Sequence, residues 1–513
     1  MNLNFIYNYN KKNYNYIFIL IFFIYIIYYY QIIQYGLSII FPNNFDSYRD
    51  IGVIKNFVFG NSKNDPSYLN EKMWYNPLSY HIVSYFCKLL GTDINISYIL
   101  IGILINVLTI IFFNIYINQY SNHFTAHFAT LFTFIILPGL DPAGNSPSIT
   151  YFGFPLHYGQ LFFILYLFVL RKYSDKKNLL YAILAGLING TLFLTHSAPF
   201  IIATLIFIVV NFYFLINSNL DKKYFIRNLL VFAILSTLIS FYFLKTVFID
   251  YKFKIYDDRP ANFWPIYFSN IYNFLKCNLF LYPLLFLLIF SFILIDDKKI
   301  FRKKIIIEIS VIFISLFLIF YLYIKRYLYD FFDYKLPNIV PILHFYFYLK
   351  FGIGLMIGHI FDKFVFIKEK IMVLIFSVFI FYFPIFNRKG DFKNEIFISE
   401  EKLEVLKFIE KETEINDVIL TDQENEIFPL LASGRKTIIG NAYFSNPYIN
   451  LEKRRIIAQN LYKNFLNNNL PNKTSDSLHL KYILLNKTNF NYQSLNYKPI
   501  FENKHEIMFK LPN

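Results

Sequence analysis

The chain has 513 residues, of which 56% are hydrophobic and 21% aromatic, and only 16% are charged. A soluble multidomain protein of this length is excluded by such a composition, which predicts a membrane protein. The net charge of +15 does not indicate a nucleic-acid partner, because much of the lysine and arginine falls in short loops between apolar runs, where positive residues set topology. Cys87 and Cys277 have no metal-ligand spacing, so neither a disulfide framework nor a cysteine metal site is expected.

The first apolar run, residues 16–40, follows Lys11 and Lys12. It is longer than the core of a signal peptide and lacks a small-residue cleavage site. We therefore expect a retained membrane anchor.

Acidic residues follow this run in the stretch "FDSYRD", which places Asp46 and Asp50 one helical turn apart with Arg49 between them. Two carboxylates that point the same way could act as a general base for an acceptor hydroxyl, or hold a divalent cation against a phosphate. In the alternative interpretation, Asp46 is the N-cap of an interfacial helix that begins at Ser47. The spacing leaves both open.

The next segment, "YNPLSYHIVSYFCKLLG" at residues 75–91, is short for a span and carries several polar residues, among them His81. If it crossed the membrane, the N-terminal lysine pair and the basic loop "RKYSDKK" would lie on opposite sides. We interpret it as an amphipathic helix in the interface.

Apolar runs with basic flanks predict about eleven membrane spans. They lie near residues 16–40, 95–117, 124–140, 153–170, 179–197, 199–216, 229–249, 279–295, 305–324, 341–361 and 371–386. The loops "RKYSDKK", "DKKYFIR", "DDKKIFRKK" and "KFVFIKEK" should be cytoplasmic, as should the N-terminus. Residues 41–94 then form a long outer loop with two interfacial helices, and the expected location is the plasma membrane.

Several polar residues fall in outer loops or in the outer halves of predicted spans. Because polar groups at membrane depth are costly, their bias to one side indicates a lined cavity, although each could also be snorkelling or locally hydrogen-bonded. The candidates for substrate binding are Arg49, His81, Asp141, His157, His196, Lys245, Arg259, Arg326, His344 and Lys350.

The last part of the chain, residues 387–513, has a different pattern from the apolar runs before it. "SEEKLEVLKFIEKETE" predicts a charged helix with an apolar stripe, and "DVILTD", "KTIIG" and "KYILLN" predict short buried strands. We therefore divide the chain into a transmembrane domain, residues 1–386, and a small extracytoplasmic α/β domain, residues 387–513. No glycine-rich phosphate loop follows a strand, which argues against a nucleotide site in the tail.

The order of these features resembles the GT-C class of polytopic glycosyltransferases, which includes protein O-mannosyltransferases, aminoarabinose transferases of lipid A and oligosaccharyltransferase catalytic subunits. The resemblance rests on "FDSYRD", "DPSYLNEKMWYNPLSYHI", "LAGLINGTLFLTHSAPF" and "NDVILTDQENEIFPLLASGRKTIIG". It implies that the first outer loop carries the catalytic acid, at Asp46. Ser47 follows Asp46 where the mannosyltransferases have an adjacent acidic pair, so Asp50 stays a second candidate for the base.

The resemblance implies an inverting glycosyltransferase. Nucleotide sugars are not expected outside the cytoplasmic membrane, so the donor would be a polyprenyl-phosphate sugar and the partners membrane lipid and a glycan, lipid or protein acceptor. Cationic side chains would neutralise the departing phosphate, and a divalent cation, if one is used, would be held by Asp46, Asp50 and Asp141. The alternatives are a transporter or flippase of lipid-linked glycans, although no duplicated half is visible, and an inactive GT-C-like scaffold.

Overall fold

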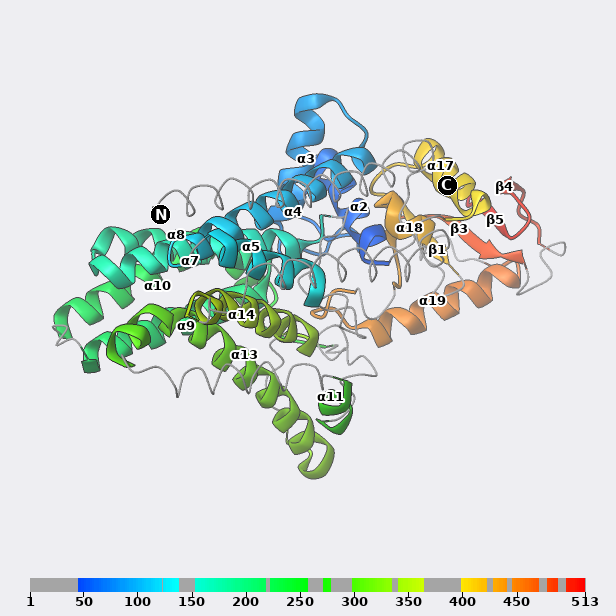
Figure 1. Ribbon diagram of the computed structural model, residues 1–513. Coiled ribbons are helices and arrows are strands. Elements are labelled where there is room, and N and C mark those ends of the chain that lie inside the picture. The colour runs from blue at the N-terminus through cyan, green and yellow to red at the C-terminus, as the bar shows by residue number, and fades with distance from the viewer. Residues whose placement is uncertain are drawn as a thin grey trace. The chain divides into compact units, whose positions relative to one another are not determined.

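Figure 1 shows the protein as a computed structural model. It describes residues 45–121, 123–137, 153–217, 222–256, 271–277, 298–334, 340–363, 398–421, 428–440, 445–469, 478–487 and 495–512. These residues form two compact units, and the division falls within the helices α4 and α10. The two units are treated separately below.

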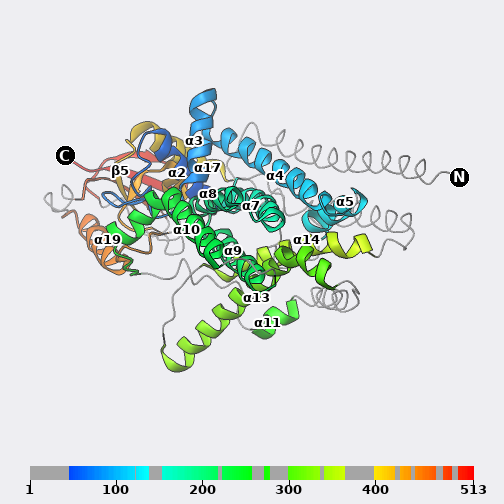
Figure 2. The same cartoon turned by 90° about the vertical axis from the view of Figure 1, so that its left-hand side faces the viewer.

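Unit 1 is helical, and its described residues lie between 102 and 240 and between 271 and 363. Its elements, some of which continue into unit 2, are α4 (Ile94–Asn118), α5 (His123–Leu131), the π-helix η1 (Phe132–Ile136), α7 (Pro155–Lys176), α8 (Leu179–Thr195), α9 (Ser197–Asn217), α10 (Lys222–Lys245), α11 (Ile271–Cys277), α13 (Lys298–Phe332) and α14 (Ile342–Lys363). Figure 2 shows α9, α10, α13 and α14 of this bundle from a second side.

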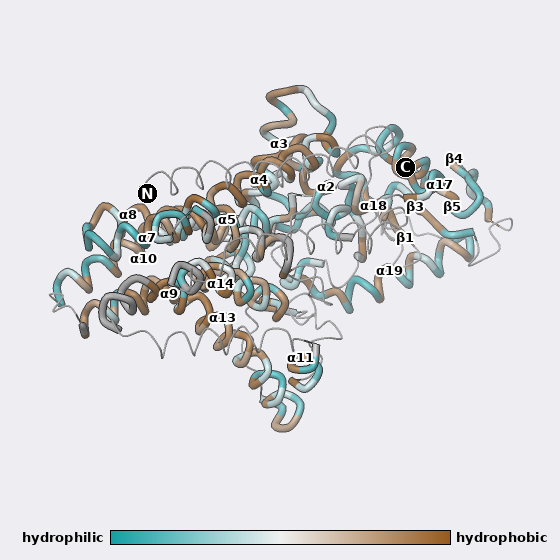
Figure 3. The backbone as a smooth tube through the Cα atoms, in the orientation of Figure 1, coloured by the Kyte–Doolittle hydropathy of each residue, from teal (hydrophilic) through white to brown (hydrophobic). Residues whose placement is uncertain are grey.

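Among the described residues, four helices are long and apolar enough to cross a membrane, and the tube in Figure 3 is brown along much of them. They comprise Ile94–Asn118, Ser197–Ile216, Lys222–Asp250 and Ile305–Phe332. Helices α4, α5, α7, α8, α9, α10, α13 and α14 all lie on predicted spans. The count of about eleven stays a prediction, because the spans at 16–40, 279–295 and 371–386 lie outside the described residues.

Small and polar residues hold the bundle together where a hydrophobic driving force between helices is missing. Gly186 and Gly190 lie one turn apart on α8, and a Cβ atom added to either would come within 2.8 Å of α10. Asn189, on the same stretch, donates hydrogen bonds to Thr204 of α9 at 2.9 Å and to Ser236 of α10 at 3.0 Å. The "LAGLING" stretch is therefore a packing face.

Unit 2 contains a five-stranded sheet with the strand order β2-β1-β3-β5-β4. Strands β1 (Val418–Thr421), β2 (Lys436–Thr437) and β3 (Leu480–Asn486) are parallel, and β5 (Glu506–Lys510) and β4 (Pro499–Glu502) are antiparallel to their neighbours. The three predicted strand segments are thus β1, β2 and β3. The domain boundary at residue 387 lies outside the described residues and stays a prediction.

Helices cover both faces of this sheet, because successive strand residues point to opposite sides. One apolar cluster joins α17 (Glu400–Glu412) and α18 (Phe428–Ser433) to one face through residues that include Ile409, Ile419, Leu430, Leu484 and Met508. The other joins α19 (Leu451–Leu466) to the opposite face through residues that include Leu420, Leu461, Phe465, Ile483 and Phe509.

The first loop belongs to the same compact unit as this sheet. It contributes α2 (Phe45–Val58) and α3 (Leu78–Leu90), and the unit also includes the π-helix η2 (Thr246–Asp250). Helix α2 contacts both α3 and α18. The two helices expected in the first loop are therefore present, while their position at a membrane interface stays a prediction.

Candidate functional site

Asp50 is the buried centre of a polar cluster at the start of α2. Its side chain is fully buried, and Arg49 donates to Oδ1 from Nη2 at 2.7 Å and from Nε at 2.9 Å. The Tyr80 hydroxyl of α3 donates to the same oxygen at 2.8 Å, and the Tyr98 hydroxyl of α4 donates to Oδ2 at 3.1 Å. Asp50 thus joins three helices of unit 2 and faces away from solvent.

Asp46 is the accessible carboxylate of this cluster. Its side chain is 48% exposed, and its Oδ1 lies 3.0 Å from Nη1 of Arg49, which therefore bridges the two acids. The Arg49 guanidinium lies over the Tyr75 ring at 4.6 Å. Helix α2 already includes Phe45, so Asp46 lies inside the first turn, and the interpretation as an N-cap before Ser47 is wrong.

Burial and charge act in opposite directions on Asp50 and Arg49. Burial raises the pKa of Asp50 from its usual value, while the positive charge of Arg49 opposes that rise. Burial disfavours the charged form of Arg49, but the neighbouring negative charges, that of Asp50 foremost, outweigh burial and raise the pKa of Arg49 above its ordinary value, so Arg49 stays charged. The arrangement can therefore present one exposed carboxylate next to a fixed cation, with the second carboxylate anchoring that cation from inside.

His81 lies on α3 and is exposed. Its ring lies 4.5 Å from that of Phe57. Of the predicted residues, Asp46, Arg49 and Asp50 are brought together, whereas no contact of His81 with them is observed among the described residues. Tyr75, Tyr80 and Tyr98 were not predicted, because nothing distinguishes them within a chain that has 44 tyrosines.

Four of the predicted residues in unit 1 lie on or next to α7, α8 and α14. His157 is buried near the start of α7, His196 follows the end of α8, and His344 lies in the first turn of α14. The rings of His196 and His344 meet edge to face at 4.5 Å. Lys350 is fully buried, with Nζ 3.8 Å from the centre of the Tyr346 ring.

The same ends of these helices hold buried polar atoms that call for a partner. Among the described residues, both amide atoms of Gln160 and the hydroxyl of Tyr348 are buried without a hydrogen bond. A Cβ atom on Gly159, next to Gln160, would lie 3.3 Å from His196 and 3.6 Å from the Tyr348 hydroxyl. This end of unit 1 is therefore closely packed and polar.

The remaining predicted residues are not grouped with one another in the described part of the chain. Lys245 is exposed at the end of α10, and Arg326 lies 3.6 Å from Asp330 on α13, with both side chains partly exposed. Asp141 and Arg259 lie outside the described residues. Over the part of the chain that the structure describes, no three metal-ligating side chains converge. Asp46 and Asp50 share Arg49 instead, and Asp141, the third residue predicted for a divalent cation, is not among the described residues, so no step is assigned to a cation.

A second buried ionic cluster, in unit 1, was not anticipated. Arg171 of α7 forms an ion pair with Glu308 of α13, and the Tyr116 hydroxyl of α4 donates to the same Glu308 oxygen at 2.6 Å. Nε2 of His359 on α14 lies 3.5 Å from the other oxygen. Arg171 belongs to "RKYSDKK", which was expected to be a cytoplasmic loop, but α7 continues to Lys176 and the Arg171 side chain is buried. Glu308, an acid within an apolar run, was a signal for this cluster.

No protein-family model matches the chain, and no curated protein matches it. Solved structures do. ArnT from Cupriavidus metallidurans bound to undecaprenyl phosphate matches with a TM-score of 0.54 at 10% identity, over 95% of this chain and 98% of that one. The apo form of the same ArnT matches with a TM-score of 0.53 at 10% identity, over 95% and 97%.

The oligosaccharyltransferase from Archaeoglobus fulgidus, in complex with Zn and sulfate, matches with a TM-score of 0.46 at 11% identity. It covers 87% of this chain, and the chain spans 64% of the oligosaccharyltransferase. The two ArnT structures, with TM-scores above 0.5, show that this chain has a GT-C-like fold, as the resemblance predicted. At this level of identity the likeness concerns the fold.

Proposed function

We propose that the protein is an inverting glycosyltransferase that moves a sugar, a hexose or pentose, from a polyprenyl-phosphate donor to an acceptor on the outer side of the membrane. The observation that carries the proposal is the exposed Asp46 carboxylate held by Arg49 on a GT-C-like fold. The ArnT that shares this fold was crystallised with undecaprenyl phosphate, which supports a polyprenyl-phosphate partner. The acceptor would be a glycan, a lipid or a protein.

In the proposed reaction, Asp46 removes the proton from the acceptor hydroxyl as its oxygen attacks the anomeric carbon of the donor. The bond from that carbon to the phosphate oxygen breaks, and the polyprenyl phosphate departs with the bonding electrons. One in-line displacement inverts the anomeric configuration. Arg49 and Asp50 position the base, which needs a fixed orientation to contribute to the rate.

The departing phosphate needs positive charge. The described cations predicted for this role are Lys245, which is exposed at the end of α10, Arg326, which is partly exposed, and Lys350, which is fully buried. Their substitution decides which of them contacts the phosphate.

A reconstitution assay tests the function directly. Purified protein in liposomes should transfer sugar from a polyprenyl-phosphate sugar, and NMR of the product should show the inverted anomer. A nucleotide sugar should not replace the lipid-linked donor. Transfer only from a nucleotide sugar, or ATP-independent movement of the intact lipid-linked glycan across the bilayer without transfer, would favour a different function, the latter the flippase alternative.

Orientation is tested by cysteine labelling in a variant in which Cys87 and Cys277 are serine. Asp175 and Lys504 are both exposed. We expect Asp175→Cys to be protected from a membrane-impermeant reagent in intact cells and Lys504→Cys to react with it. Reaction of both from the same side would contradict the cytoplasmic position of "RKYSDKK" or the outer position of the tail.

A further inference from the structure

Helix α2 approaches the turn between α18 and β2 more closely than any side chain would allow. A Cβ atom on Gly52 would lie 1.9 Å from the carbonyl oxygen of Leu431. On the other side, Gly434 has a φ of +70° and its Cβ atom would lie 2.7 Å from the carbonyl oxygen of Gly52. Glycine is required at both positions, because only its missing side chain permits this backbone contact.

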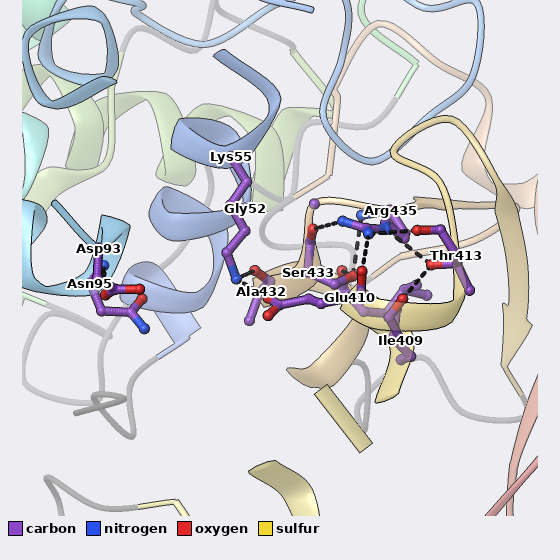
Figure 4. A network of polar contacts seen from close by, with 12 residues as sticks. Gly52, Lys55, Asp93, Asn95, Ile409, Glu410, Thr413, Ala432, Ser433 and Arg435 are labelled. Carbon is purple, nitrogen blue, oxygen red and sulfur yellow. Dashed lines mark hydrogen bonds and ion pairs between the residues drawn. The ribbon is translucent and has the colours of Figure 1, made fainter. Parts of the chain in front are cut away.

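Buried polar bonds lock the contact one turn further along α2. Figure 4 shows Lys55 reaching from α2 to Glu410 of α17, with which it forms an ion pair, and to the carbonyl oxygen of Ala432 at 2.8 Å. The amide of Asn56 donates to the carbonyl oxygen of Gly434 at 2.8 Å. Its oxygen accepts from Nζ of Lys436 at 2.9 Å. Each bond links residues that are more than 350 positions apart in the chain.

The contact also reaches the acidic end of α2. Tyr48, between Asp46 and Arg49, packs on Phe428 with ring centres 4.1 Å apart. The receiving surface is itself rigid, because Arg435 donates to the carbonyl oxygens of Ser433 at 2.9 Å and Thr413 at 2.7 Å and so ties α18 to the end of α17 (Figure 4). Residues 428–436 therefore support α2 from Tyr48 to Asn56.

We propose that residues 428–436 of the tail form the mount that positions α2, and with it Asp46, so that Gly52 and Lys55 are positioning residues for the transfer reaction. This inference rests on the function proposed above and deepens it. It makes the tail a part of the catalytic unit rather than a separable domain. A base displaced by about 1 Å can lose about 10²-fold in rate, so the mount has a direct effect on catalysis.

The test uses the full-length protein in liposomes and two readouts, which are amide hydrogen exchange of residues 45–58 and the kinetics of sugar transfer. Gly52→Ala forces a methyl group against the Leu431 carbonyl, and we expect faster exchange of α2 and a fall in kcat of about 10²-fold with little change in KM. Lys55→Met, the milder variant, removes both bonds of the ammonium and should change both readouts in the same direction.

Two matched controls come from the same loop. Gly60 has a positive φ, and a Cβ atom there would meet nothing within 4 Å, so Gly60→Asn should change neither readout, since asparagine tolerates this conformation. Lys63 is exposed, and Lys63→Met should also be neutral. If Gly52→Ala and Lys55→Met leave exchange unchanged, or speed exchange while kcat stays constant, the mount is refuted.

The failure of the proposed function gives a different pattern. Asp46→Asn should lower kcat about 10²–10⁴-fold while the exchange of α2 stays as in the wild type. If the wild-type protein transfers no sugar, the glycosyltransferase proposal fails, and the exchange rates of Gly52→Ala and Lys55→Met still decide whether residues 428–436 hold α2.

Discussion

The two units each contain a buried arginine–carboxylate cluster, and the two clusters use the same parts. In unit 2 Arg49 pairs with Asp50, which also accepts from Tyr80 and Tyr98. In unit 1 Arg171 pairs with Glu308, which also accepts from Tyr116. Both carboxylates are fully buried and both accept a tyrosine hydroxyl, so neither is available to a substrate.

They differ in the second partner of the arginine. Arg49 also holds Asp46, which is 48% exposed, whereas Arg171 lies over the Tyr120 ring at 4.9 Å. The unit 1 cluster joins α4, α7, α13 and α14 through buried side chains. The unit 2 cluster leaves one carboxylate at the surface, which is why we place the chemistry there and assign a structural role to Glu308.

The largest expected effect follows from that exposed carboxylate. Asp46→Asn should lower kcat about 10²–10⁴-fold, because a general base contributes about that much to a transferase rate. The free energy of unfolding of this variant should differ from that of the wild type by less than about 1 kcal/mol, since an exposed ion pair contributes little. Transfer assays and thermal unfolding of the purified variant measure the two effects.

Asp50→Asn is the matched comparison. It should destabilise unit 2 by about 1–3 kcal/mol, because buried hydrogen bonds from Arg49, Tyr80 and Tyr98 lose their charged acceptor. If Asp46→Asn retains full transfer and Asp50→Asn is inactive although stably folded, the catalytic role moves to Asp50. If both variants are active, "FDSYRD" is not catalytic.

In unit 1 we expect a loss of stability instead. Glu308→Gln leaves the Arg171 charge buried without its anion. This should lower the free energy of unfolding by about 3–5 kcal/mol. The double variant Arg171→Met/Glu308→Leu should recover most of this loss, because apolar side chains of similar volume can replace a buried ion pair. A stable Glu308→Gln variant with reduced transfer would assign the cluster a role in the reaction.

Asp65 is a buried carboxylic acid that forms no ion pair with an arginine among the described residues, so it can be compared with Asp50 and Glu308, which do. Asp65 is buried and accepts from the backbone amides of Ser67 and Tyr68 and from Asn446. Burial raises its pKa from 3.8 to about 6. Between pH 4 and 6 the folded protein therefore holds a proton that the unfolded chain has released, so this contribution to stability is complete below pH 4 and is lost as pH rises to 6.

The lost contribution is about 3 kcal/mol, at 1.36 kcal/mol for each pKa unit. We expect the free energy of unfolding of the wild type to fall relative to that of Asp65→Asn as the pH rises from 4 to 6. Above pH 6 the difference between the two proteins should stay constant. A difference that does not depend on pH over this range would show that Asp65 ionises at an ordinary pKa in the folded protein.

The fold class was predictable because apolar runs and basic flanks depend only on local sequence. The three parallel strands of the tail were predictable for the same reason. The spacing of Asp46 and Asp50 predicted that both side chains point the same way, yet one is exposed and one is buried. Spacing could not show this, since Tyr80 and Tyr98, which cover Asp50, lie on other helices.

The mount under α2 was also beyond sequence reasoning. Gly52 and Gly434 are 382 positions apart, and a single sequence contains no signal that pairs them. Nothing in the sequence distinguishes Lys55 from the other cations of a chain with a net charge of +15. Glu308 is the contrasting case, because an acid inside an apolar run predicts a buried partner, although not which one.

The smallest expected effect concerns the exposed ion pair of Arg326 and Asp330 on α13, whose side chains are 39% and 50% exposed. Because an exposed pair contributes about 0–1 kcal/mol, Asp330→Asn should leave both stability and transfer nearly unchanged, in contrast to the two buried clusters. Arg326→Gln tests whether Arg326 also binds the donor phosphate, since this variant removes the cation as well as the ion pair. If Arg326 contacts the donor phosphate, Arg326→Gln raises KM for the polyprenyl-phosphate sugar while Asp330→Asn does not. Equal, near-neutral kinetics for the two variants would remove Arg326 from the substrate-binding residues and leave Lys350 and Lys245 as the described cations to be tested.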